Sequence, residues 1–123
     1  MEKKQTVVIL GASKNPARYS FQALLLLKNK GHRIIPVNPI LDIIEGIPVV
    51  HSISEINEKI DTLTLYVNSG RSESLSDQIY ELKPDRVIFN PGTESEKLKI
   101  ELEKRNITCI EACTLVLLKT GMF

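Results

Sequence analysis

The chain has 123 residues, of which 42% are hydrophobic and 25% charged, and its formal net charge is +1. This size and composition predict one domain, residues 1–123, with a single core and no room for a separate catalytic domain. The near-balanced charge gives no reason to expect nucleic acid or a membrane surface as a partner, and no apolar run approaches the roughly 20 residues that cross a bilayer.

Short apolar runs and helical patterns alternate along the chain. The polar residues before Thr6 lack the pattern of a secretory signal, which favours a cytoplasmic location. Apolar runs predict five strands, over residues 6–10, 34–37, 63–67, 86–89 and 107–110. Apolar periodicity and capping residues predict helices over residues 16–30, 72–82, 93–105 and 113–119, with Thr93 as one cap, and a helical turn over 54–57 opened by Ser54.

This alternation is typical of βαβ units, in which right-handed crossovers join parallel strands. We therefore expect an α/β, Rossmann-like, three-layer domain with a five-stranded parallel sheet in the order 3-2-1-4-5. Pro36 lacks an N–H, so it must lie at the end or the edge of its strand.

Ligands of such sheets bind beyond the carboxyl ends of the strands, where the strand order reverses. The loops predicted there are rich in small and polar residues, and they cover residues 11–17, 38–39, 68–71, 90–94 and 111–114. The helix N-termini that follow these loops direct unpaired N–H groups toward an anion. This edge is therefore the expected binding site.

The strongest local signal is the run Gly11-Ala12-Ser13-Lys14-Asn15-Pro16, which follows a strand and precedes a helix, as a phosphate-binding turn does. Gly11 would make the tight turn, and the N–H groups that follow would hold a pyrophosphate. Lys14 and Arg18 would add positive charge. The alternative is an ordinary loop with two solvated cations.

The same loop departs from the dinucleotide fingerprint G-x-G-x-x-G, because Ser13 and Pro16 stand at its second and third glycine positions. The second strand ends in Val37-Asn38-Pro39 and not in the acidic residue that binds an NAD ribose, so NAD is disfavoured. Coenzyme A carries a 3′-phosphate, which favours a cation instead. Lys14, Arg18 or Arg71 would meet that need.

These residues resemble the small CoA-binding protein family, whose domain is similar to the N-terminal domain of the succinyl-CoA ligase α subunit. The resemblance rests on residues 8–13 with Pro16, on 31–39, on Gly46 and on 60–61. It implies a Rossmann-like fold that binds CoA, with the phosphates at Gly11 to Lys14 and Arg18. It also implies that the adenosine end lies near Val37, Asn38, Pro39 and the turn Asn68, Ser69, Gly70. Residues 89–93 and 111–113 depart from the family pattern.

No catalytic constellation emerges from the remaining chemistry-bearing residues. His32 is expected at the surface, and His51 lies in an irregular segment without a carboxylate arrangement that suggests a base. Cys113 begins a predicted helix, which can stabilise a thiolate, but Glu111 opposes this; Cys109 is expected in the core. The two cysteines, without a neighbouring histidine, predict no metal site.

The resulting hypothesis is non-catalytic binding of CoA or an acyl-CoA, with the protein as a possible homo-oligomer or the companion of a partner enzyme. Two alternatives remain: an NAD(P)-binding redox protein or sensor on the same fold, and a thiol-dependent enzyme that uses Cys113.

Overall fold

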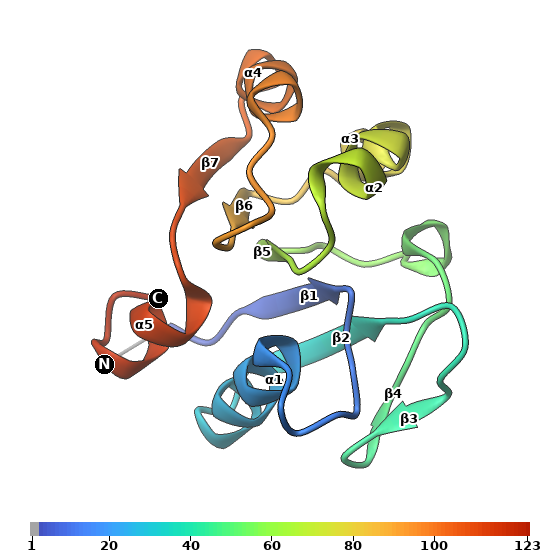
Figure 1. The fold of residues 1–123 in the computed structure, drawn as a ribbon, viewed down its shortest axis with the longest axis vertical. Coiled ribbons are helices and arrows are strands. Elements are labelled where there is room, and N and C mark those ends of the chain that lie inside the picture. The colour runs from blue at the N-terminus through green and yellow to red at the C-terminus, as the bar shows by residue number, and fades with distance from the viewer. Residues whose placement is uncertain (1–2) are drawn as a thin grey trace.

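The computed structural model describes residues 3–123, which form a five-stranded parallel sheet with helices on both faces (Figure 1). The strands of the sheet are β1 (Thr6–Leu10), β2 (Arg33–Val37), β5 (Thr62–Leu65), β6 (Arg86–Phe89) and β7 (Thr108–Glu111). A small antiparallel hairpin of β3 (Ile43–Ile44) and β4 (Ile47–Pro48) follows β2. The predicted Rossmann-like α/β class is confirmed.

The helices divide between the two faces (Figure 1). One face carries α1 (Tyr19–Asn29) and α5 (Thr114–Lys119); the other carries α2 (Ser69–Ser74), α3 (Ser76–Leu82), α4 (Glu96–Lys104) and the 3-10 helix η1 (Ile53–Glu55). Successive residues of β1 pack into the two cores in turn, Val7 and Ile9 on the α1 side and Val8 and Leu10 on the other. Burial on both faces explains why the strands are continuous apolar runs. None of the helices in residues 3–123 is long and apolar enough to cross a bilayer.

The strand order differs from the expected one in a single placement. The order is β2-β1-β5-β6-β7, so counting the five strands along the chain gives 2-1-3-4-5, with β5 beside β1 and not beyond β2. The expectation 3-2-1-4-5 put the second strand inside the sheet, which conflicts with its proline. The carbonyl of Pro36 points outward and accepts the N–H of Val50 at 3.0 Å. The missing N–H of Pro36 therefore lies on the outer side of an edge strand.

Four helix starts also differ from the prediction, the first being α1, which was expected from residue 16 and begins at Tyr19. The helix expected over residues 72–82 begins at Ser69 with Asn68 as its cap, and it breaks at Leu75 into α2 and α3. Ser95, not Thr93, caps α4, and Ser52, not Ser54, caps η1. For α4 and η1 a serine two positions away from the expected cap has the same capping chemistry, so the sequence alone does not separate them.

His32 is buried, with 8% of its surface exposed, which corrects the expectation of a surface residue. Its Nδ1 accepts the N–H of Gln5 at 3.0 Å, and its ring meets the ring of Phe123 edge-on at 5.4 Å between centroids. The guanidinium of Arg86 lies 4.7 Å from the centroid of the same Phe123 ring. Phe123 thus covers the amino edge of the sheet.

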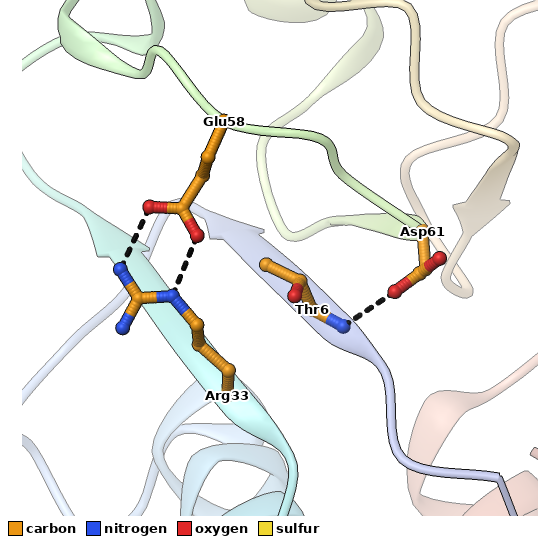
Figure 2. A network of polar contacts seen from close by, with 4 residues as sticks. All are labelled: Thr6, Arg33, Glu58 and Asp61. Carbon is orange, nitrogen blue, oxygen red and sulfur yellow. Dashed lines mark hydrogen bonds and ion pairs between the residues drawn. The ribbon is translucent and has the colours of Figure 1, made fainter.

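Two carboxylates hold the segment before β5 against β1 and β2 (Figure 2). Glu58 receives two hydrogen bonds from the Arg33 guanidinium, at 2.6 and 2.7 Å, and Asp61 accepts the N–H of Thr6 at 2.7 Å. The hydrogen bonds from Arg33 lower the pKa of the Glu58 carboxyl. Both contacts lie at the amino edge, so this edge is closed by internal pairing.

A buried amide at the opposite edge joins three elements. Asn90, 3% exposed, donates from Nδ2 to the Thr64 hydroxyl at 2.7 Å and to the Leu65 carbonyl at 2.8 Å. Its Oδ1 accepts the N–H of Thr114 at 2.9 Å. These bonds fix the loop after β6 to the end of β5 and to the start of α5.

Asn90→Ala is expected to lower the free energy of unfolding by about 2 to 4 kcal/mol, because buried backbone groups of Leu65 and Thr114 lose their partner. Urea denaturation monitored by circular dichroism measures this loss. Asn57→Ala removes an amide from an exposed position and should change stability by less than about 0.5 kcal/mol. Equal effects of the two substitutions would contradict this role for Asn90.

Candidate functional site

The loop after β1 is bound to the end of β2. The N–H groups of Gly11 and Ala12 both donate to the Val37 carbonyl, at 3.3 and 3.1 Å. The Asn38 side chain donates from Nδ2 to the Ala12 carbonyl at 2.9 Å. The first two N–H groups of the loop, which the sequence assigned to a pyrophosphate, are therefore already used within the protein.

Gly11 makes the expected tight turn, with φ at +92°. A Cβ atom at this position would lie 2.9 Å from the Tyr66 carbonyl oxygen and 3.0 Å from Cγ1 of Val67. The loop thus passes directly against the backbone that follows β5. Only glycine combines this φ with this approach.

The middle of the loop leaves two backbone donors available. The Ser13 hydroxyl accepts the N–H of Asn15 at 3.0 Å, and Oδ1 of Asn15 accepts the N–H of Ala17 at 3.0 Å. Among residues 3–123, no acceptor pairs with the N–H groups of Ser13 and Lys14. Two consecutive free N–H groups next to a cationic side chain suit an anion.

The N-terminus of α1 is open to a ligand. Its cap residue, Arg18, makes no side-chain capping bond, whereas α2 and α4 are capped by Asn68 and Ser95. The first intrahelical donor is the N–H of Gln22, so the preceding turn of this 11-residue helix retains its unpaired N–H groups. The helix dipole adds partial positive charge at the same place.

A pocket of about 430 Å³, the first pocket, lies at this helix start and extends to the loops after β5 and β6. Of the residues predicted to bind, Arg18 and Asn68 line it. The sequence did not single out its other lining residues, which are Ala17, Tyr19, Ser20, Tyr66, Val67, Pro91, Gly92 and Thr93. Residues 90–94 had been expected at this edge only as a loop.

Tyr66 contributes a phenol that remains protonated. Its hydroxyl is buried and has no hydrogen-bond partner within the described residues, although Thr64 and Thr114 lie near it. Burial raises the pKa of the Tyr66 hydroxyl to about 12. Tyr66 therefore cannot serve as a base at neutral pH.

A second pocket, also of about 430 Å³, lies between the ends of β1 and β2 and the start of α3. Val37, Pro39 and Arg71, the last as a candidate cation for the 3′-phosphate, were predicted and line it. The residues missed are Leu10, His51, Ser52, Ile53, Val67, Leu75 and Gln78. Val67 lines both pockets, so they are neighbours along the carboxyl edge. The second pocket combines an aliphatic floor with a polar rim.

His51 has a carboxylate neighbour, which corrects the interpretation of the irregular segment. Its Nε2 lies 2.9 Å from Oδ1 of Asp42, and both side chains are largely exposed. The two residues are brought together by the β3–β4 hairpin, which returns the chain to the end of β2. The pair places an imidazole at the rim of the second pocket.

The carboxyl edge carries cations without carboxylate partners. Lys14, Arg18 and Arg71 are exposed, and in residues 3–123 none of them forms an ion pair within 4.0 Å. Some cations elsewhere are paired, as in Lys59 with Asp85 and Lys104 with Glu101, although others, such as Lys97 and Lys99, form no ion pair within the described residues. The unpaired charge at this edge favours an anionic ligand.

The remaining predicted residues lie at the same edge but outside the two pockets. Ser69 and Gly70 form the first turn of α2, and the loop residues 11–16 contact neither pocket directly. Cys113 precedes α5 and is half-buried, and it lines neither pocket. Cys109 packs against the core, and burial raises the pKa of its thiol to about 11.

The family model for CoA-binding domains matches residues 5–119. The chain belongs to this CoA-binding domain family. A crystal structure of an uncharacterized protein is similar to it with 38% identity and a TM-score of 0.94, covering 99% of this chain and 100% of the other. YneT of Bacillus subtilis (strain 168) is 26% identical over 112 residues, which are 89% of this chain and 82% of YneT.

The fold also recurs inside a larger protein. Acetyl-coenzyme A synthetase 1 of Ca. Korarchaeum cryptofilum, solved with phosphate and ADP, is 20% identical with a TM-score of 0.74. The match covers 88% of this chain but 25% of the synthetase chain. This likeness shows the fold alone.

Gly11→Ala should lower the free energy of unfolding by about 2 to 4 kcal/mol, because it adds a clash with the Tyr66 backbone to an unfavourable φ. Gly46→Ala is the matched control: its φ is +77°, and nothing lies within 4 Å of its added Cβ. It should cost only about 1 to 2 kcal/mol. Thermal and urea unfolding compare the two, and equal losses would rule out the close approach at Gly11.

Proposed function

We propose that this protein binds CoA or an acyl-CoA along the carboxyl edge of its sheet and catalyses no reaction on its own. The observation that carries the proposal is a pair of neighbouring pockets, each of about 430 Å³, that meet at Val67 beside the open N-terminus of α1. Membership of the CoA-binding domain family supports the ligand class.

The pyrophosphate of CoA is assigned to the start of α1. The free N–H groups of the first turn of α1 and of Ser13 and Lys14 supply donors, and Arg18 supplies charge from the pocket wall. These groups need no rearrangement of the loop, because Gly11 and Ala12 are already fixed to Val37. The pantetheine arm would then continue through the first pocket.

The adenosine end is assigned to the second pocket. Leu10, Val37 and Ile53 are buried aliphatic residues that offer an apolar surface to the adenine ring. Arg71 and His51 stand at the polar rim, where a 3′-phosphate would gain from positive charge. Arg71 is the first candidate for this contact because it has no competing carboxylate within ion-pair distance in the described chain.

The geometry at the end of β2 favours CoA over NAD. A ribose-binding carboxylate would be needed where Asn38 stands, and the amide of Asn38 instead holds the Ala12 carbonyl and accepts the N–H of Ile40 and Leu41. As a binding module in the cytoplasm, the protein would depend on a partner enzyme for any chemistry on the acyl group.

Titration calorimetry with CoA, 3′-dephospho-CoA and NAD tests the ligand. CoA should bind roughly tenfold more tightly than 3′-dephospho-CoA, because one charge-assisted contact to an exposed phosphate is lost. NAD should bind more weakly than CoA. A preference for NAD would overturn the proposal.

Arg18→Ala should weaken CoA binding roughly tenfold to a hundredfold through loss of a charge-assisted contact. The same measurement on Lys104→Ala removes an equal charge from the far end of α4 and should leave the affinity unchanged. Turnover assays with acetyl-CoA, run in parallel, should show no hydrolysis of the thioester above background. An unaltered affinity of Arg18→Ala for CoA would show that the phosphates do not bind at the start of α1.

A further inference from the structure

The two outer strands of the sheet, β2 and β7, are protected to different extents. The outer side of β2 is covered, since Val50 forms a bridge with Val37 and bonds with Pro36 and Asn38, and Pro36 has no N–H to offer. On the opposite side of the sheet, no ribbon of residues 3–123 lies outside β7 (Figure 1). An uncovered edge presents backbone groups that can pair with another strand.

The backbone of β7 alternates between the two sides. The N–H groups of Thr108 and Ala112 donate toward β6, to the carbonyls of Asp85 and Phe89. The backbone groups of Ile110, midway between them, therefore also face β6. Cys109 and Glu111 therefore direct their N–H and C=O groups outward. In residues 3–123 no strand pairs with that side.

We propose that the protein forms a two-fold symmetric dimer in which β7 pairs antiparallel with β7 of a second copy. The five-stranded sheets of the two copies then form one continuous sheet. With the axis at Ile110, Cys109 of each copy exchanges both backbone hydrogen bonds with Glu111 of the other. Ile110 of one copy then lies opposite Ile110 of the other, and these two residues form a non-hydrogen-bonded pair. This register leaves no outward group of Cys109 or Glu111 unpaired.

Helix α4 supports the choice of a second copy as the occupant. Lys99 and Glu103, one turn apart on α4, both lie near Cys109 of the outer strand β7, and the Cys109 thiol is 4.0 Å from the Lys99 carbonyl oxygen. Neither has an ion-pair partner within 4.0 Å in the described residues. The two-fold axis brings the two α4 helices side by side and antiparallel, so Lys99 of each copy faces Glu103 of the other.

Charge reversal tests this arrangement. Sedimentation velocity on the whole protein should show a dimer, and Lys99→Glu or Glu103→Lys should each raise its dissociation constant roughly tenfold, because like charges then meet at two symmetric points. The double variant Lys99→Glu/Glu103→Lys should restore the dimer. Lys97→Glu, on the opposite side of α4, is the control and should leave the dimer unchanged.

Cross-linking tests the register independently. Ile110→Cys, in a Cys109→Ala/Cys113→Ala background, should form an intermolecular disulfide on mild oxidation, since paired Cα atoms at the axis lie about 4.5 Å apart. Thr108→Cys in the same background should stay reduced, because its two copies would lie about 13 Å apart along the strands.

A wild-type protein that stays monomeric up to about 1 mM, the weakest affinity of interest, would overturn the proposal. So would a dimer that is insensitive to both charge reversals and gives no disulfide through Ile110→Cys. A double variant that remains as dissociated as the single ones would overturn the facing of Lys99 and Glu103. Circular dichroism on every variant separates these outcomes from a loss of folding.

Discussion

The close approach of Gly11 to the backbone after β5 is the constraint on which the carboxyl edge depends. The turn passes between the Val37 carbonyl, which accepts its N–H, and the Tyr66 carbonyl, which leaves no space for a Cβ atom. This places the loop flat against the sheet end, so that α1 begins beside the first pocket with its first N–H groups free. A bulkier turn would lift the helix start away from the pocket, and the donors would no longer converge on it.

The pairing of charged side chains differs between the amino edge and the carboxyl edge of the sheet. At the amino edge, Arg33 pairs with Glu58, Asp61 receives the N–H of Thr6, and Lys59 pairs with Asp85 (Figure 2). At the carboxyl edge the cations have no such partners, although the net charge of the whole chain is only +1. The bulk charge therefore conceals a local positive site, which only the placement of acids in the fold makes visible.

Most of the strands were predictable because they are buried on both faces, as the continuous apolar run Val7 to Leu10 shows. The exception is β7, none of whose residues is fully buried. The order of the strands was not predictable, because similar apolar runs do not specify their neighbours; Pro36 alone carried that information, as the mark of an edge. In the site, Arg18, Asn68, Val37 and Pro39 could be found because they follow strands. Arg71 could be named as a candidate cation for the same reason. His51 could not, since the β3–β4 hairpin places it at the end of β2.

The titratable groups within reach of the carboxyl edge bear on what this module can do. Tyr66 and Cys109 are held in their protonated forms by burial, with pKa values raised to about 12 and about 11, so neither supplies a base or a nucleophile at neutral pH. His51 is oriented by Asp42, but both are exposed, and His51 lines the pocket assigned to adenosine and not the first pocket, which the thioester end would occupy. A base placed at the adenosine end has no bond to act on in a thioester. The binding role proposed above, with any chemistry on the acyl group left to a partner enzyme, requires neither a base nor a nucleophile from Tyr66, Cys109 or His51.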